Sequence, residues 1–204
     1  QKLSDKILGF SGRAELVGMP AVCGIHNSLK IVKEIETLTG MDVFEIPGMP
    51  PSIPGLRLKN AFEKNLSHHG VTFLSNAKIA FHAMEGGHFL LKAANDNLET
   101  GIKAKGVILA SGRFPGGGLF AKRNIIIETI FKLPVFQPAE RDLWHQLNFF
   151  DPKGHRINQA GLETDDRFRP VDKTGNPAFE NLYAAGSILA HNDWARLKTG
   201  AGVS

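Results

Sequence analysis

The sequence predicts an α/β fold, and three of its stretches lead to this prediction. Val107–Leu109 is a short apolar run, typical of a buried strand, and it is followed by the small residues Ala110–Gly112. Asn181–Gly186 is a second apolar run that ends in small residues. Between residues 26 and 38, apolar side chains recur at the spacing of one helical face. Strands and helices that alternate along a chain are typical of α/β domains.

Residues 1–75 are predicted to form an α/β region with a strand–helix–strand–helix pattern. The opening segment, residues 1–13, is polar and contains glycine, so we expect it to lack regular structure. Prolines and glycines between residues 47 and 55 exclude regular structure there as well. The predicted elements are a strand at Glu15–Met19, a helix at His26–Leu38 ended by Gly40, a strand at Asp42–Ile46, a helix from about Gly55 to His68, and a strand at Val71–Leu74.

Residues 76–204 are predicted to form a β-meander followed by the two apolar strands that define the fold. Gly86 and Gly87 mark a tight hairpin within the meander. The run Ile125–Ile130 fits either a strand or a buried helix, because its periodicity does not decide between them. The other predicted strands are Lys78–Met84, His88–Ala93, Ile102–Leu109 and Asn181–Gly186.

Composition excludes several classes of protein. The net charge of +4 is scattered, and no basic run with interleaved aromatic residues indicates nucleic-acid binding. Cys23 is the single cysteine, so no internal disulfide and no Cys-x-x-Cys metal motif is possible, and we expect a small buried residue there and no metal. No apolar run approaches the about 18 residues of a membrane span, so we expect no direct membrane insertion. The chain opens with Gln1 and stops just after Val203, which suggests a piece of a longer polypeptide.

Glycine follows both defining strands. Gly116–Gly118 come shortly after the first strand, and the segment Arg196–Ser204 resembles a loop that enters a helix at its glycines. Small residues at the carboxyl end of a strand let a ligand approach the backbone, and open α/β sheets bind their ligands there. One such turn is also compatible with a loose connection that binds nothing. Two in one chain favour a cofactor that lies across several strand ends.

Five segments together resemble a known family. Their sequences are MPAVCG (19–24), PGMPPSIPGLRLKNAFEKNL (47–66), ILASGRFPGGGLFAKRN (108–124), TDDRFRP (164–170) and ENLYAAGSILA (180–190). With the closing TGAGV, they resemble flavoproteins of the type with two dinucleotide-binding domains. Within that type, their order and spacing resemble the B subunit of anaerobic glycerol-3-phosphate dehydrogenase.

This resemblance implies a fragment of a flavin-binding Rossmann-like domain, with a β-meander and a smaller mixed α/β region. Residues 76–204 would be its meander and its flavin-facing carboxyl-terminal part. The amino-terminal nucleotide-binding unit, with its GxGxxG turn, is absent from this sequence. We therefore expect FAD or FMN as the cofactor of the family, and we expect this piece not to retain it.

The resemblance also implies a function. The complex would oxidise sn-glycerol 3-phosphate to dihydroxyacetone phosphate and pass the electrons to quinone. The partners implied are a catalytic A subunit and a membrane-attached iron–sulfur C subunit, which would place the protein in the cytoplasm at the inner face of the membrane. Two alternatives stay open. One is a non-catalytic assembly or electron-relay subunit of the same complex, and the other is a flavin oxidoreductase with another substrate.

Oxidation of a phosphorylated alcohol by a flavin needs a base for the hydroxyl proton and cations for the phosphate. We expect His191 to be the catalytic base, although a lone loop histidine is also compatible with simple solvation. Arg57, Arg123 and Arg196 are the expected substrate-binding residues, with surface ion pairs as the alternative. The expected cofactor-binding residues are Ala110, Ser111, Gly112, Gly186, Ser187, Gly200, Gly202 and Val203.

Overall fold

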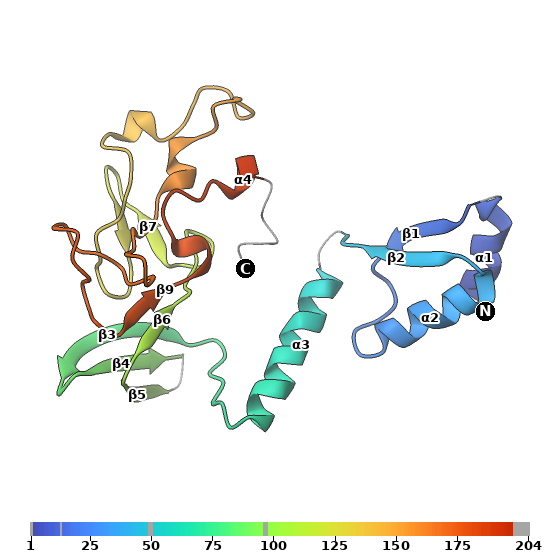
Figure 1. Ribbon diagram of the computed structural model, residues 1–204, viewed down its shortest axis with the longest axis horizontal. Coiled ribbons are helices and arrows are strands. Elements are labelled where there is room, and N and C mark those ends of the chain that lie inside the picture. Colours follow the sequence, from blue (N-terminus) through green and yellow to red (C-terminus); the bar gives the residue numbers. More distant parts are fainter. Residues whose placement is uncertain (1, 13, 49–50, 96–97, 198–204) are drawn as a thin grey trace. The chain divides into compact units, whose positions relative to one another are not determined.

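The computed structural model describes residues 2–12, 14–48, 51–95 and 98–197. Gly200, Gly202 and Val203 therefore lie outside the described residues. The chain divides into a first unit, Gln1–Ser75, and a second unit, Asn76–Ser204, which are described separately below (Figure 1).

The first unit is built on a βαβ motif. Strand β1 (Leu16–Pro20) lies parallel to β2 (Asp42–Ile46), and helix α2 (Ser28–Thr39) connects them. Gly40 ends α2 in the left-handed conformation, φ 69°, and its N–H donates to the carbonyl of Glu36. A small core of Met19, Cys23, Ile35 and Val43 lies between the helix and the strand pair.

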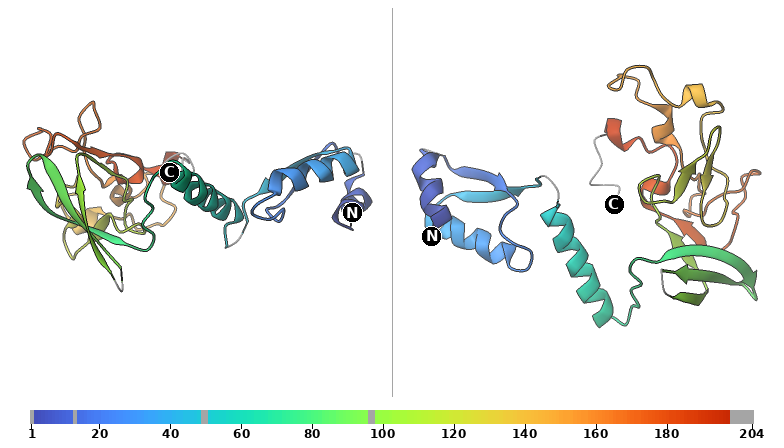
Figure 2. Two further views of the ribbon diagram at one scale, coloured as in Figure 1. Left: turned by 90° about the horizontal axis from the view of Figure 1, so that it is seen from below. Right: turned by 180° about the vertical axis from the view of Figure 1, so that it is seen from behind.

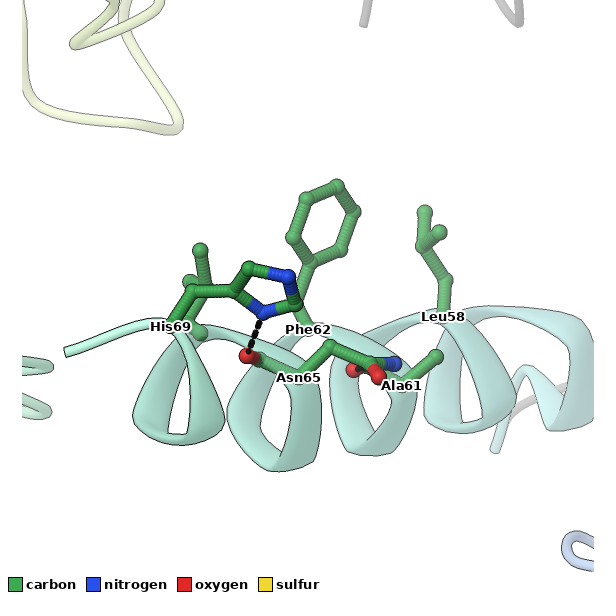
Figure 3. A pocket seen from close by; sticks show the side chains of 6 residues that line it. Leu58, Ala61, Phe62, Asn65 and His69 are labelled. Atoms are coloured by element: carbon green, nitrogen blue, oxygen red, sulfur yellow. Dashed lines mark hydrogen bonds between the residues drawn. The ribbon is translucent and has the colours of Figure 1, made fainter. Parts of the chain in front are cut away.

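Helix α3 (Ile53–His68) follows the proline-rich segment. Ser52 caps it, since the Ser52 Oγ accepts a hydrogen bond of 3.2 Å from the N–H of Gly55. None of its residues is buried among the described residues. Figure 3 shows a shallow pocket on a single face of α3. The residues that line it are Leu58, Ala61, Phe62, Asn65, Leu66 and His69.

The second unit begins with the predicted β-meander. Strands β3 (Lys78–Glu85), β4 (His88–Ala94) and β5 (Glu99–Ala104) form an antiparallel sheet in that order (Figure 2). Four phenylalanine rings, two of them from β3 and β4, pack against one another with centroid separations between 4.9 and 6.3 Å. They are Phe81, Phe89, Phe131 and Phe179. This aromatic cluster joins the meander to segments far along the chain, around Phe131 and Phe179.

Two short strand pairs complete the second unit. Strand β6 (Val107–Leu109) lies parallel to β9 (Leu182–Ala184), and β7 (Leu119–Ala121) pairs antiparallel with β8 (Ile126–Glu128). The remaining elements are the 3₁₀ turns η1 (Arg141–Leu143), η2 (Arg156–Gln159) and η3 (Gly186–Ile188) and the short helix α4 (Trp194–Leu197). Their common core contains Leu119, Ile126, Leu162, Leu182 and Ile188, each at most 1% exposed.

Four expectations about local structure are wrong. Regular structure is not excluded throughout residues 47–55, because helix α3 begins at Ile53 and has Pro54 in its first turn, where the missing N–H costs nothing. Residues 1–13 contain helix α1 (Lys2–Ser11), because Ile7 packs against the core of the first unit and gives the segment a buried face. Val71–Leu74 forms no strand, and Val71, Phe73 and Leu74 stay almost half exposed without a neighbouring strand. The predicted strand Ile102–Leu109 is two strands, because Val107 changes partner and donates to the carbonyl of Asn181 at 2.9 Å.

The ambiguous run at Ile125–Ile130 contains strand β8, which covers Ile126–Glu128, and no helix. No helix among the described residues is both long and apolar enough to cross a membrane.

Candidate functional site

The ends of β6 and β9 meet in the second unit. Leu109 pairs with Ala184 in register, and the N–H of Ala185 donates to the carbonyl of Leu109 at 3.1 Å. A Cβ atom placed on Gly112 would lie 3.5 Å from the Ser187 Oγ. The structure therefore brings together five of the predicted cofactor-binding residues: Ala110, Ser111, Gly112, Gly186 and Ser187.

Both turns need glycine. Gly112 has φ 67° and Gly186 has φ 76°, a left-handed conformation that residues with a side chain rarely adopt. Gly118 folds back on the same turn, since a Cβ atom there would lie 2.5 Å from the Ser111 Oγ. Gly116 and Gly118 thus pack against the backbone of Ser111 and Gly112 at the end of β6, where a Cβ atom would clash.

These residues fit a flavin cofactor on two observations. The Ser111 Oγ is one of two buried side-chain polar atoms in the described part of the chain without a hydrogen-bond partner. Buried hydroxyl groups are normally bonded, so this one is available to a ligand group at the strand end. In addition, the turns at Gly112 and Gly186 present backbone without side chains, as the close approach of a dinucleotide requires.

Arg113 lies beneath the two turns and is only 6% exposed. Its Nε donates to the carbonyl of Ser187 at 2.7 Å, and its Nη2 donates to those of Leu189 at 3.0 Å and Asn192 at 2.8 Å. Its Nη1 donates to the carbonyl of Asn158. Burial lowers the pKa of the Arg113 guanidinium, and the nearby Asp193 carboxylate opposes this shift. An arginine nevertheless stays protonated in a folded protein.

His191 stands in the loop that follows η3. Its Nε2 lies 3.0 Å from the Oε1 of Glu163, and its ring lies 4.1 Å from the ring of Phe136, measured between centroids. Glu163 can only accept when ionised, so the proton is assigned to Nε2 and the lone pair of the neutral ring to Nδ1. The backbone of His191 has φ 62°, an uncommon conformation for a residue with a side chain.

The predicted substrate-binding arginines lie in different surroundings. Arg123 is exposed beyond β7, and its carbonyl accepts from Arg141 at 2.9 Å. Arg196 is exposed on α4, and its Nη1 donates to the carbonyl of Lys153 at 3.1 Å. No hydrogen bond among the described residues joins either of them to His191 or to the strand-end turns.

Arg57 belongs to the first unit and has its own partners there. Its Nη1 and Nη2 donate to the two carboxylate oxygens of Glu45 at 2.5 and 3.1 Å, and its Nε donates to the carbonyl of Gly24 at 2.8 Å. This bidentate pair lowers the pKa of Glu45 to about 2. Burial raises the pKa of the neighbouring Cys23 thiol, which is 3% exposed as predicted.

Sequence reasoning missed Arg113, Glu163 and Glu128. The Glu128 carboxylate is fully buried and accepts N–H groups from Ile130, Phe131 and Leu133. The position of Glu128 inside the apolar run Ile125–Ile130 could have indicated this, because a charged side chain buried with its apolar neighbours requires hydrogen-bond partners. Arg113 directly follows the predicted turn, but nothing in its neighbours shows that it is buried. In the described part of the chain, no three His, Cys, Asp or Glu side chains gather as metal ligands would.

Two parallel strands that end in adjoining glycine turns are typical of α/β proteins that bind a nucleotide cofactor. The chain belongs to the FAD binding domain family, whose family model matches residues 1–203. The α/β flavin-binding fold expected from the sequence is confirmed by this match.

Within this family, the chain is similar in sequence to B subunits of anaerobic glycerol-3-phosphate dehydrogenases. The chain is 30% identical over 203 residues to the B subunit from Vibrio vulnificus strain YJ016, an overlap of 99% of this chain and 46% of that protein. It is also 30% identical, over 99% of this chain and 47% of the relative, to a probable B subunit from Halobacterium salinarum strain R1. The B subunit from Aliivibrio fischeri strain ES114 is 29% identical over 214 residues, covering 100% of this chain and 47% of the relative.

The resemblance to this B subunit that the sequence predicts is thereby confirmed. The chain spans about half the length of the curated relatives it matches.

Proposed function

We propose that the protein containing this chain is a FAD-dependent oxidoreductase that serves as the B subunit of an anaerobic glycerol-3-phosphate dehydrogenase. It oxidises sn-glycerol 3-phosphate to dihydroxyacetone phosphate, and the electrons pass to quinone. The observation that supports this most is the meeting of the β6 and β9 turns at Gly112 and Gly186. FAD is preferred over FMN because the family to which the chain belongs is an FAD-binding one.

The proposed cofactor surface consists of the two turns and of the closing segment. FAD, when bound, supplies the two-electron acceptor for the hydride that leaves carbon 2 of the substrate. Backbone at Gly112 and Gly186 allows the close approach, and the unpartnered Ser111 hydroxyl offers a hydrogen bond to it. The residues proposed to bind the cofactor are Ala110, Ser111, Gly112, Gly186, Ser187, Gly200, Gly202 and Val203.

The proposed proton acceptor is the Nδ1 atom of His191. The substrate hydroxyl loses its proton to this nitrogen while carbon 2 loses a hydride, so that the alcohol becomes a ketone. Glu163 supports the role, because a carboxylate that accepts from Nε2 orients the ring and stabilises its protonated form. The backbone strain at His191 is compatible with such a site.

Arg123 and Arg196 are the proposed phosphate contacts, since both guanidinium groups are exposed and keep free donors. Arg57 has three of its donors occupied by Glu45 and Gly24, so it has the least capacity left for a phosphate. The proposed partners are a catalytic A subunit and a membrane-attached iron–sulfur C subunit. With them, the protein is proposed to lie in the cytoplasm at the inner face of the membrane.

The first experiment is the visible absorption spectrum of the intact natural protein, followed by denaturation and identification of the released flavin. We expect a flavin band and released FAD. A colourless protein that takes up no added FAD would contradict the oxidoreductase role and support the alternative of an assembly subunit. Released FMN would contradict only the cofactor identity.

The second experiment measures reduction of a dye by sn-glycerol 3-phosphate, with glycerol and sn-glycerol 1-phosphate as controls. We expect reduction with sn-glycerol 3-phosphate alone. A flavin-containing protein that is reduced by none of the three compounds, with and without its partners, would favour an oxidoreductase with another substrate. Activity that appears only with the partner subunits would favour an electron relay.

A further inference from the structure

We infer that Arg113 is a positioning residue for the cofactor: its guanidinium fixes the loop from Gly186 to Asn192 against the Ser111–Gly112 turn before FAD binds. The inference rests on the proposed function and adds to it the device that holds the shape of the site. It concerns residues of the second unit alone, all within the described part of the chain.

The hydrogen bonds of Arg113 are concentrated on one loop. Of its five N–H donors, four are used, and three of these go to the carbonyls of Ser187, Leu189 and Asn192. The fourth goes to Asn158 in η2, which anchors the loop to the body of the unit. The loop cannot shift as a whole without breaking several hydrogen bonds to a charged donor, and such bonds are the strong ones in proteins.

Burying the Arg113 guanidinium costs desolvation free energy, which its hydrogen bonds must offset. Arg113 is 6% exposed, and no ion pair within hydrogen-bonding range balances it among the residues described. Asp193, also 6% exposed, is the charge that acts on it from nearby. Among the described residues, the partners of the guanidinium are four carbonyl groups and no paired carboxylate, so its desolvation is offset only while the loop keeps the conformation that presents these carbonyls.

That conformation belongs to the proposed cofactor site. Arg113 directly follows Gly112, and its Nε holds the carbonyl of Ser187, so one side chain connects both strand-end turns. The 3₁₀ turn Gly186–Ile188 is too short to be stable by itself. Ordering it in advance removes an entropic penalty from FAD binding, as preorganisation does in general. His191 lies between two of the held carbonyls, so its backbone is fixed by the same contact.

The test compares Arg113→Met and Arg113→Lys with the wild type in the intact natural protein. Phe89→Leu is the control for stability, because Phe89 is fully buried in the aromatic cluster of the second unit. Two quantities are measured: the dissociation constant of FAD for the apoprotein, from quenching of FAD fluorescence, and hydrogen exchange of the amides of residues 186–192 without FAD.

We expect Arg113→Met to weaken FAD binding at least tenfold and to accelerate exchange at residues 186–192 by a similar factor. Arg113→Lys should weaken binding at least threefold, because one ammonium group cannot reach the same four carbonyls in the arrangement of a planar guanidinium. Phe89→Leu should lower the denaturation midpoint and leave both quantities within twofold of the wild type.

A folded Arg113→Met protein with FAD affinity and loop exchange within twofold of the wild type would overturn the inference. If this variant does not fold, the same result with Arg113→Lys overturns it. If the wild-type apoprotein takes up no FAD, that result contradicts the proposed function and not the role of Arg113. The exchange measurement then still decides whether Arg113 orders the loop, so the two failures are distinguishable.

Discussion

Removing the charge of Glu45 tests the bidentate pair that joins α3 to β2 in the first unit. Glu45→Gln keeps the shape of the side chain and an acceptor for the N–H of Cys23, which donates to the Glu45 Oε1 at 2.8 Å. It removes the negative charge that Arg57 contacts through both terminal nitrogens. The exposed fractions of the two side chains, 21% for Arg57 and 10% for Glu45, make this pair partly desolvated.

The magnitude follows from the pKa of Glu45, which falls from 4.5 to about 2, chiefly through its hydrogen bond to Arg57. Fully protected from solvent, such a change would correspond to about 3 kcal/mol of stability. Water reaches one side of the pair and screens it, so we expect about 1–2 kcal/mol. Because the pKa is lowered on folding, this stability is complete above pH 4.5 and is lost as the pH falls towards about 2.

The stability of the first unit is measured by hydrogen exchange of peptides from β1 and β2. Both tryptophans and the single tyrosine lie beyond residue 75, so fluorescence does not report on the first unit. The single variants Glu45→Gln and Arg57→Gln and the double variant form a cycle that isolates the coupling energy of the pair. Lys59→Gln is the control on the same helix, since its 3.7 Å pair with Glu63 is exposed.

We expect a coupling of about 1–2 kcal/mol at pH 7 that disappears near pH 2, and less than about 0.5 kcal/mol for Lys59. A coupling below about 0.3 kcal/mol at pH 7 would refute this reasoning. It would leave Arg57 free for another role, including the phosphate contact expected from the sequence.

Three further predictions concern the second unit. Gly112→Val should weaken FAD binding at least tenfold in the intact protein, whereas Gly175→Ala, at an open position with φ 84°, should lower stability by about 1–2 kcal/mol and leave FAD affinity unchanged; equal affinities would contradict the site. Glu128→Gln should lower the denaturation temperature by several degrees, since it costs about 2–4 kcal/mol to leave buried N–H groups poorly paired, and a shift below about 1 °C would be inconsistent with this. His191→Asn should reduce dehydrogenase turnover about 10²–10⁴-fold with an unchanged FAD content, and undiminished turnover would exclude His191 as the base.

Much of the fold followed from local patterns. The βαβ motif of the first unit, helix α3 and the meander all appear where periodicity and glycine placed them, because each pattern repeats over several consecutive residues. The exceptions depended on distant contacts. Helix α1 has a buried face only because Ile7 meets the core, and Val71–Leu74 lacks the neighbouring strand that its apolar character anticipated. Contacts with residues distant in the sequence can override the helix or strand propensity of a segment, and local patterns do not reveal such contacts.

The sequence by itself indicated the two strand-end turns, since glycine adopts at little cost the left-handed backbone that Gly112 and Gly186 have in the structure. Only the tertiary structure decided that Arg113 holds these turns together and that Glu163 contacts His191. The carbonyl partners of Arg113 lie 45 to 79 residues further along the chain, and Glu163 lies 28 residues before His191. Polar contacts at such separations leave no periodic trace in a sequence, because they arise only when strands, loops and charges are brought together by burial.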